Sequence, residues 1–406
     1  MQTNLADFIR NTPDGDEADA ILRSCVHCGF CTATCPTYQL LGDELDGPRG
    51  RIYLIKQVLE GAPVTAKTQQ HLDRCLTCRN CETTCPSGVK YSRLVDIGRK
   101  VVEQRVTRPF MERMQRLLVR ETVSRKALFG TALALGRIAR PLLSPALQDK
   151  IPLRQSAGAW PTRSHARKMW VLDGCAQPAM APNINSATAR VLDALGVQLL
   201  VAPRAGCCGA LRHHLNEHEA ALDDMRRNID AWWPALHDGS VEAIVMTASG
   251  CGATVKDYGH LLAHDAAYAD KAQRVSAATR DLSEILEEFI AVLPTRTRLS
   301  ERVAYHPPCT LQHGQQIRGK VEAVLRAVGV EVVLCGDSHL CCGSAGSYSL
   351  LQPELSVQLR DRKLAHLAET GATTIVSANV GCSAHLQSGT DTPVLHWIEL
   401  IDRALA

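Results

Sequence analysis

Two short runs of cysteines decide how the N-terminal part of this 406-residue chain is read. The first run is Cys25-Val26-His27-Cys28-Gly29-Phe30-Cys31-Thr32-Ala33-Thr34-Cys35-Pro36. The second is Cys75-Leu76-Thr77-Cys78-Arg79-Asn80-Cys81-Glu82-Thr83-Thr84-Cys85-Pro86. Both follow the pattern C-x2-C-x2-C-x3-C-P. The chain has 17 cysteines, and such grouping in a large protein indicates metal rather than disulfides.

The same spacing occurs in ferredoxins that hold two [4Fe–4S] clusters. Three thiolates two residues apart wrap one corner of an iron–sulfur cube, and the fourth is carried away to ligate the other cube. Structural zinc is disfavoured, because four-cysteine zinc sites usually use two CxxC pairs with a spacer. We expect one [4Fe–4S] cluster on Cys25, Cys28, Cys31 and Cys85, and a second on Cys75, Cys78, Cys81 and Cys35.

The segment between the two runs predicts a helical insertion. Ile52, Ile55 and their neighbours fit a stripe of 3.6-residue period, after a turn at 46–51. Such insertions resemble the α-helical ferredoxin domain of fumarate reductase and related iron–sulfur subunits. Arg49 and Arg51 either offset the charge of anionic clusters or cap a turn at the surface.

The second half of the chain repeats itself from about residue 168 to residue 406. Each copy carries a cysteine, then Cys-Cys-Gly, then a further cysteine, and the first gap is 32 residues in both copies. The text at 191–197 also matches the text at 324–330. The repeated cysteines are Cys175, Cys207, Cys208 and Cys251 in the first copy, and Cys309, Cys341, Cys342 and Cys382 in the second.

Each copy predicts a small α/β unit. In the first copy we expect strands at 169–172, 197–201 and 243–246, with helices reaching Leu195 and covering 214–233. The repeated cysteines then lie where strands give way to loops. Ligands collect at that edge of an open α/β sheet.

This arrangement resembles the cysteine-rich CCG domain, which occurs twice in the heterodisulfide reductase B subunit. The fuller pattern of that family ends in CxxC, but the last position here is Thr254 in the first copy and His385 in the second. The missing thiolate argues against the double-cubane-like clusters of that family. Two alternatives stay open for this half: a third, conventional iron–sulfur cluster, or reduced thiols that serve as structure.

Composition argues against several classes of protein. A formal net charge of +3 is no nucleic-acid signature. No apolar run reaches the ~18 residues of a membrane span, and the first residues lack the apolar core of a secretory signal. Because no G-x-G-x-x-G and no P-loop is present, we predict no catalytic residue and no organic cofactor here. A partner must hold the flavin.

A basic segment separates the two halves. Residues 99–170 carry 16 Lys and Arg against four acids, with apolar positions interleaved. Such a stretch either docks on anionic lipid or an acidic partner, or forms a solvated helix before a linker. The predicted fold class is α + α/β. Expected domains are a helical ferredoxin-type domain at 1–100, a basic helical linker at 101–167, and CCG domains at 168–297 and 298–406.

Over nearly all its length the chain resembles the iron–sulfur subunits of bacterial glycolate oxidase (glycolate dehydrogenase). Besides the cysteine runs, the matching text includes Gly174–Pro178 and Ser338–Gly346. The resemblance implies a three-subunit enzyme. An FAD-binding subunit oxidises glycolate to glyoxylate, a second flavoprotein-like subunit supports it, and this subunit passes electrons onward, with quinone as the expected acceptor. A cytoplasmic location is expected, with peripheral contact to the inner membrane.

Three other functions stay open. The first is the iron–sulfur subunit of anaerobic glycerol-3-phosphate dehydrogenase. The second is a heterodisulfide-reductase-like thiol/disulfide catalyst that acts through Cys207 or Cys208. The third is a zinc-held scaffold without a redox role. Iron and sulfide analysis with EPR separates the scaffold from the redox proteins, and a substrate screen separates the two dehydrogenases.

Overall fold

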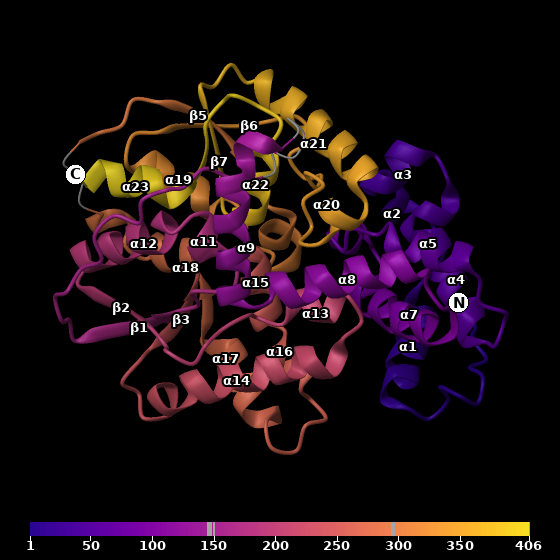
Figure 1. Cartoon of the computed structure of the whole chain (residues 1–406). Coiled ribbons are helices and arrows are strands. Elements are labelled where there is room, and N and C mark those ends of the chain that lie inside the picture. The colour runs from indigo at the N-terminus through magenta and orange to yellow at the C-terminus, as the bar shows by residue number, and fades with distance from the viewer. Residues whose placement is uncertain (144–147, 149–150, 294–296, 406) are drawn as a thin grey trace. The chain divides into compact units, whose positions relative to one another are not determined.

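The computed structural model describes residues 1–143, 148, 151–293 and 297–405, and the chain divides into two compact units (Figure 1). The first unit comprises Met1–Leu117 and His339–Leu359. The second comprises Leu118–Ser338 and Arg360–Ala406. Two helices, α8 (Phe110–Val123) and α21 (Pro353–Ala368), run along the chain from the first unit into the second.

The described residues of the first unit form helices and loops without a strand. Proline at the first turn starts α1, α3 and α4, where its missing N–H costs nothing. Helices α4 and α7 pack closely, because Gly98 leaves room for Ile55: a Cβ at Gly98 would lie 2.6 Å from Ile55 Cγ1. Besides α8 and α21, the elements are α1 (Pro13–Ser24), α2 (Phe30–Ala33), α3 (Pro36–Leu41), η1 (Glu44–Asp46), α4 (Pro48–Leu59), α5 (Ala66–Asp73), α6 (Asn80–Thr84), α7 (Tyr91–Arg105) and α20 (Tyr348–Leu351).

The second unit contains two parallel four-stranded sheets, with strand orders β2-β1-β3-β4 and β6-β5-β7-β8. The strands are β1 (Arg167–Val171), β2 (Val197–Val201), β3 (Ala243–Met246), β4 (Thr279–Asp281), β5 (Arg302–His306), β6 (Glu331–Leu334), β7 (Thr374–Ser377) and β8 (Val394–His396). Registers agree between the copies, since Met169 lies beside Leu199 and Ala243, and its counterpart Val303 lies beside Val332 and Thr374.

Helices cover both faces of the sheets, as their continuous apolar strands require. In the first sheet Val245 packs in a core shared with α12, α18 and the second sheet, whereas Ile244 packs in a core with α14 and α17. The helices are α9 (Lys126–Ala139), η2 (Arg140–Leu142), α11 (Gln177–Met180), α12 (Asn183–Ala194), α13 (Ala210–His214), α14 (His218–His237), α15 (Ser249–Val255), α16 (Tyr258–Leu261), α17 (Ala269–Ala278), α18 (Leu282–Glu287), η3 (Ile290–Val292), η4 (Thr310–Gly314), α19 (Lys320–Ala327), α22 (Val380–Gln387) and α23 (Trp397–Leu405).

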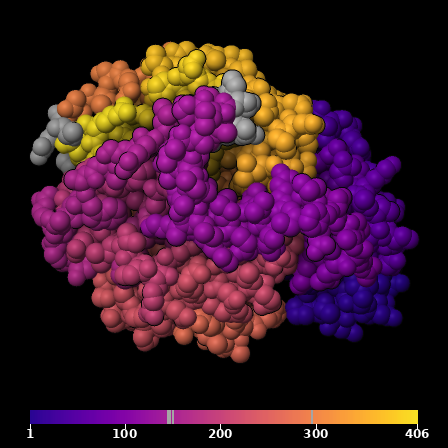
Figure 2. Space-filling model, in the orientation of Figure 1, coloured from indigo at the N-terminus to yellow at the C-terminus, as the bar shows by residue number. Residues whose placement is uncertain are grey.

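The predicted fold class is confirmed: a helical N-terminal part precedes two α/β copies with parallel sheets. The basic segment contains α8 and α9, whose apolar side chains stay largely exposed, and α9 forms part of the surface seen in Figure 2. Among the residues that the structure describes, no helix combines the length and apolar character needed to cross a bilayer.

Candidate iron–sulfur sites

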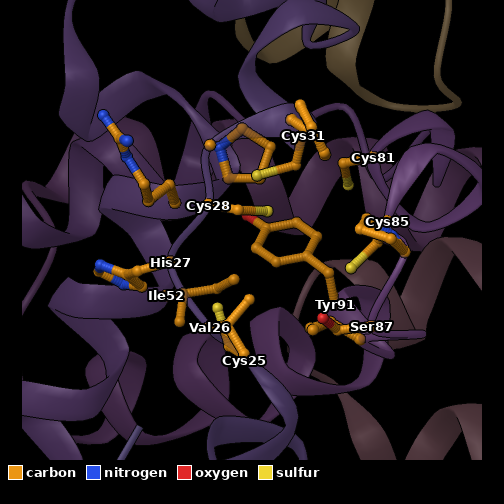
Figure 3. Close-up of a pocket in the computed structure, with 16 residues that line it drawn as sticks. Cys25, Val26, His27, Cys28, Cys31, Ile52, Cys81, Cys85, Ser87 and Tyr91 are labelled. Carbon is orange, nitrogen blue, oxygen red and sulfur yellow. The ribbon is translucent and has the colours of Figure 1, made fainter.

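Four of the predicted ligands surround one pocket of the first unit. Cys25 ends α1, Cys28 and Cys31 lie in the loop before α2 and in α2 itself, and Cys85 ends α6. In Figure 3 their sulfur atoms surround the pocket near the Tyr91 ring. About 430 Å³ within this pocket is free of protein atoms.

The other four predicted ligands line a second pocket, with about 370 Å³ free of protein atoms. Cys75 and Cys78 come from the second loop and Cys81 from α6, while Cys35 is brought in from the first run at the start of α3. The structure therefore gathers the eight thiols in the two predicted groups. Cys81 lines both pockets.

The two loops share an unusual backbone. The residues on either side of the middle cysteine have positive φ in both: 58° at His27 and 85° at Gly29, against 53° at Thr77 and 60° at Arg79. Left-handed residues other than glycine are uncommon and cluster at functional sites. This conformation curls each loop so that its three thiols face one space.

The buried thiols of these pockets resist ionisation on their own. Burial, aided by neighbouring Cys25, raises the pKa of Cys31 to about 11. Burial, aided by Cys78 and Cys75, raises the pKa of Cys81 well above its ordinary value. Since metals bind the thiolate, a cation in the pocket must supply the charge that ionises these groups. Iron in a cluster would do so, and the all-sulfur donor set suits it.

A buried cation lies beside the second pocket. The Arg51 side chain is 1% exposed, donates to the carbonyl of His71 at 2.7 Å, and pairs with Asp46. Burial opposes its charge, but Tyr91, Cys75 and other nearby groups raise the pKa of Arg51 above its ordinary value. The surface-cap alternative is therefore wrong for Arg51, whereas Arg49 is partly exposed and pairs with Glu44.

Sequence reasoning missed three residues that shape the second pocket. Tyr91 donates its hydroxyl to Cys75 Sγ at 3.7 Å. Arg99 is buried and donates to the carbonyl of Cys75 at 2.7 Å. Asp46 accepts hydrogen bonds from Arg51, Arg74 and His71. No local spacing signals the roles of Tyr91 and Arg99, whose contacts with Cys75 span 16 and 24 positions, whereas Asp46 lies five positions from Arg51.

The four thiols of the first repeat converge at the carboxyl ends of β1, β2 and β3. Cys175 hydrogen-bonds Cys207, and Cys208 hydrogen-bonds both Cys207 and Cys251. These contacts raise the pKa of Cys175 and Cys208 and lower that of Cys207, which accepts both hydrogen bonds. The predicted gathering at the sheet edge is found here, with thiol contacting thiol.

Support for this group comes from α14 and α16. Asn228 donates to the carbonyl of Cys207 at 2.8 Å, and Tyr258 donates to the carbonyl of Cys208 at 2.9 Å. Gly209, at φ 86°, lets the loop approach α14, because a Cβ there would lie 2.9 Å from the carbonyl oxygen of Ala221. The Cys-Cys-Gly loop is thus fixed by its own repeat.

The thiols of the second repeat are divided between the two compact units. Cys309 follows β5, and Cys382 lies in α22, where its sulfur accepts from Asn379 at 3.4 Å; both belong to the second unit. Cys341 and Cys342 belong to the first unit. There Cys341 Sγ accepts from the backbone N–H of Gly343 at 3.4 Å.

Comparison with known families assigns the N-terminal cysteines and the repeated cysteines to two different kinds of domain. Residues 21–89 match the 4Fe-4S dicluster domain, and residues 169–256 and 303–387 each match the cysteine-rich domain called CCG. A solved structure of a hypothetical protein from Helicobacter pylori shares the fold, with a TM-score of 0.53 at 9% identity over 98% of this chain and 73% of that one.

Two curated relatives match nearly end to end. The glycolate oxidase iron-sulfur subunit of Escherichia coli K12 is 56% identical over 100% of this chain and 99% of its own length. The probable glycolate oxidase iron-sulfur subunit of Bacillus subtilis 168 is 30% identical over 91% and 89%. This chain belongs to the family of glycolate oxidase iron–sulfur subunits, the electron-transfer subunits of an oxidoreductase.

Proposed function

We propose that this chain relays electrons within a multisubunit, FAD-dependent enzyme that oxidises glycolate to glyoxylate. The observation that carries the proposal is the pair of pockets lined by these eight thiols: each predicted set of four lines one pocket, and Cys81 also reaches the other. The substrate follows from the names of the relatives, which are glycolate oxidase subunits.

The ligand sets are part of the proposal. Cys25, Cys28, Cys31 and Cys85 hold one [4Fe–4S] cluster, and Cys75, Cys78, Cys81 and Cys35 hold the other. Such clusters accept and release electrons one at a time. The protein holds the thiols in place and sets Arg51 and Arg99 beside the second pocket. These cations favour the more negative, reduced state of the second site.

The electron donor is an FAD-binding subunit, supported by a second flavoprotein-like subunit, and membrane quinone is the acceptor. Exposed apolar side chains on α9, such as Leu135 and Ile138, support peripheral contact with the inner membrane. We keep the division into domains at 1–100, 101–167, 168–297 and 298–406 as a proposal, with the CCG half as a partner dock or further relay.

The repeated cysteines form a candidate third site. In the first repeat, Cys175, Cys207, Cys208 and Cys251 form a chain of neighbouring thiols at one sheet edge. Cys309, Cys341, Cys342 and Cys382 are the corresponding set. Thiols left as structure would give no additional iron, and that outcome is measurable.

Anaerobic purification of the full-length chain with its flavoprotein partner tests the proposal. We expect iron and sulfide in equal amounts, and EPR signals from two interacting clusters after glycolate is added. Glycerol 3-phosphate serves as the comparison substrate, and reduction by it alone would favour the other dehydrogenase. Zinc in a colourless protein would contradict any relay, and disulfide-dependent spectra that vanish in Cys207→Ser would favour thiol/disulfide catalysis.

A further inference from the structure

The first cysteine loop, residues 25–31, is open to solvent, whereas the second, residues 75–81, is closed. The middle thiols show the difference directly, since Cys28 is exposed and Cys78 is buried. Spacing and backbone are alike in the two loops, so neither explains the contrast.

The residues beside the thiols follow the same division. Val26 is 68% exposed, but its counterpart Leu76 is 6% exposed. Phe30 is 61% exposed, but its counterpart Asn80 is 2% exposed. The open loop thus exposes large apolar side chains at positions where the side chains of the closed loop are buried.

The second loop is covered by a distant segment of its own compact unit. Asn80 Nδ2 donates to the carbonyls of Thr34 and His339, both at 3.1 Å. Tyr348 donates its hydroxyl to the carbonyl of Arg74 at 3.2 Å, just before the second loop. Residues 339–359 therefore close this loop.

We infer that the first loop is the docking site of the flavoprotein that donates electrons to this chain. The inference rests on the proposed function and adds the place where the donor binds. Cys28 brings a ligand thiol to the surface, and Val26, Phe30 and the exposed Tyr53 supply apolar contact around it. The donor covers this loop as residues 339–359 cover its twin.

The size and charge of the exposed patch around the first loop limit which partner can bind there. Residues 25–31 include no Lys, Arg, Asp or Glu, and Arg49, which borders the loop at Gly29, is paired with Glu44. Interface centres are depleted of charge and enriched in aromatic side chains. Three exposed side chains fall short of the ~800 Å² per partner that a standard complex buries. A dimer of this chain through the patch alone is therefore disfavoured, whereas electron-transfer contacts lie at the small end of interface sizes.

Each transfer across this face moves one electron. The donor flavin is oxidised by one electron, and the site formed by Cys25, Cys28, Cys31 and Cys85 is reduced by one. That electron then passes to the second site. Two transfers fully oxidise a two-electron-reduced flavin, and its protons are released on the donor side.

Stopped-flow reduction of the full-length chain by its flavoprotein partner tests the inference. The variant is Val26→Ser/Phe30→Ser, and the matched control is Leu142→Ser, an exposed apolar residue of the second unit. We expect flavin-to-cluster transfer to slow about tenfold or more in the double variant, which corresponds to a rise of about 1.4 kcal/mol in the activation free energy. Iron content and direct reduction by dithionite should match wild type.

A second variant keeps the test decisive if the loop variant loses iron. Tyr53→Ser lies on α4, outside the cysteine loop, and should slow the same transfer by a smaller factor. Unchanged transfer in both variants overturns the docking site and leaves the proposed function intact. A wild-type protein that takes no electrons from the flavoprotein contradicts the proposed function instead. A dimer in wild type that is lost in Tyr53→Ser would assign the face to a second copy and overturn the inference.

Discussion

Thiols are arranged in opposite ways in the first unit and in the first repeat. In the first unit eight thiols surround two spaces, held apart by short loops and helix ends. In the first repeat, Cys207 and Cys208 hydrogen-bond each other and their neighbours directly. The first unit therefore surrounds spaces that suit a bulky inorganic group, whereas the thiols of the first repeat interact with one another.

The largest expected effect comes from removing one predicted ligand of the first unit. Cys75→Ser should remove the second cluster and lower electron flow to the acceptor by orders of magnitude, because the relay loses a station. Iron analysis and quinone-reductase activity measure it. The control is Cys335→Ser, which removes a buried thiol outside all the predicted ligand sets. It should keep the iron content and the quinone-reductase activity of wild type. Normal quinone reduction in Cys75→Ser would contradict the relay.

The second test asks whether the repeat adds iron. Cys208→Ser should leave the EPR signals of the first unit unchanged, since its contacts lie within the repeat. If the repeat holds a cluster, iron falls by the content of that cluster. If the thiols are structural, iron stays constant. Loss of the signals of the first unit would show that the two regions are not independent.

A third, smaller effect concerns the charge near each thiol group. Arg51→Met leaves Asp46 without one of its cations in a buried site, which typically costs about 3 kcal/mol. Arg49→Met breaks a partly exposed pair and should cost about 1 kcal/mol or less. Thermal melting of the anaerobic proteins measures both, and equal losses would contradict the buried-cation argument.

The smallest effect is a dependence on pH in the repeat. Burial, then the charge of Cys207, raises the pKa of Asp224 to about 6, against about 3.9 in an unfolded chain. The native state binds more protons between these values, so stability is fully present below about pH 4 and falls as pH rises toward 6. Between pH 5 and 7 the free energy of unfolding should fall by about 1 kcal/mol less in Asp224→Asn than in wild type, as measured by thermal melts. The exposed neighbour variant, Asp223→Asn, should leave the slope unchanged.

The sequence predicted what local spacing encodes. Regular cysteine intervals predicted two ligand sets, which stay a prediction although each set lines one pocket, and apolar runs predicted the strands found at 197–201 and 243–246. The fourth strand, Thr279–Asp281, was missed because three residues with two polar ends carry no strand pattern. The helix expected at 214–233 begins later, at His218, because α13 ends at His214.

Long-range closure could not be predicted. The hydrogen bond from Asn80 to His339 joins residues 259 positions apart, and periodicity holds no information at that distance. Arg51 was ambiguous in part for the same reason, since its burial depends on the carbonyl of His71, 20 positions away, as well as on Asp46 within its own turn. Cysteine motifs predict which side chains bind a cluster, whereas tertiary packing determines which of the two loops stays exposed to solvent.

The contribution of residues 339–359 to the first unit also has a consequence for biosynthesis. Synthesis begins at the N-terminus and domains fold as they emerge, yet this unit lacks its last piece until most of the chain has left the ribosome. The second cysteine loop thus stays accessible to iron-delivery proteins throughout translation. The segment can pack over the loop only after residues 339–359 have been synthesised, so the covered form of the second loop arises late in translation.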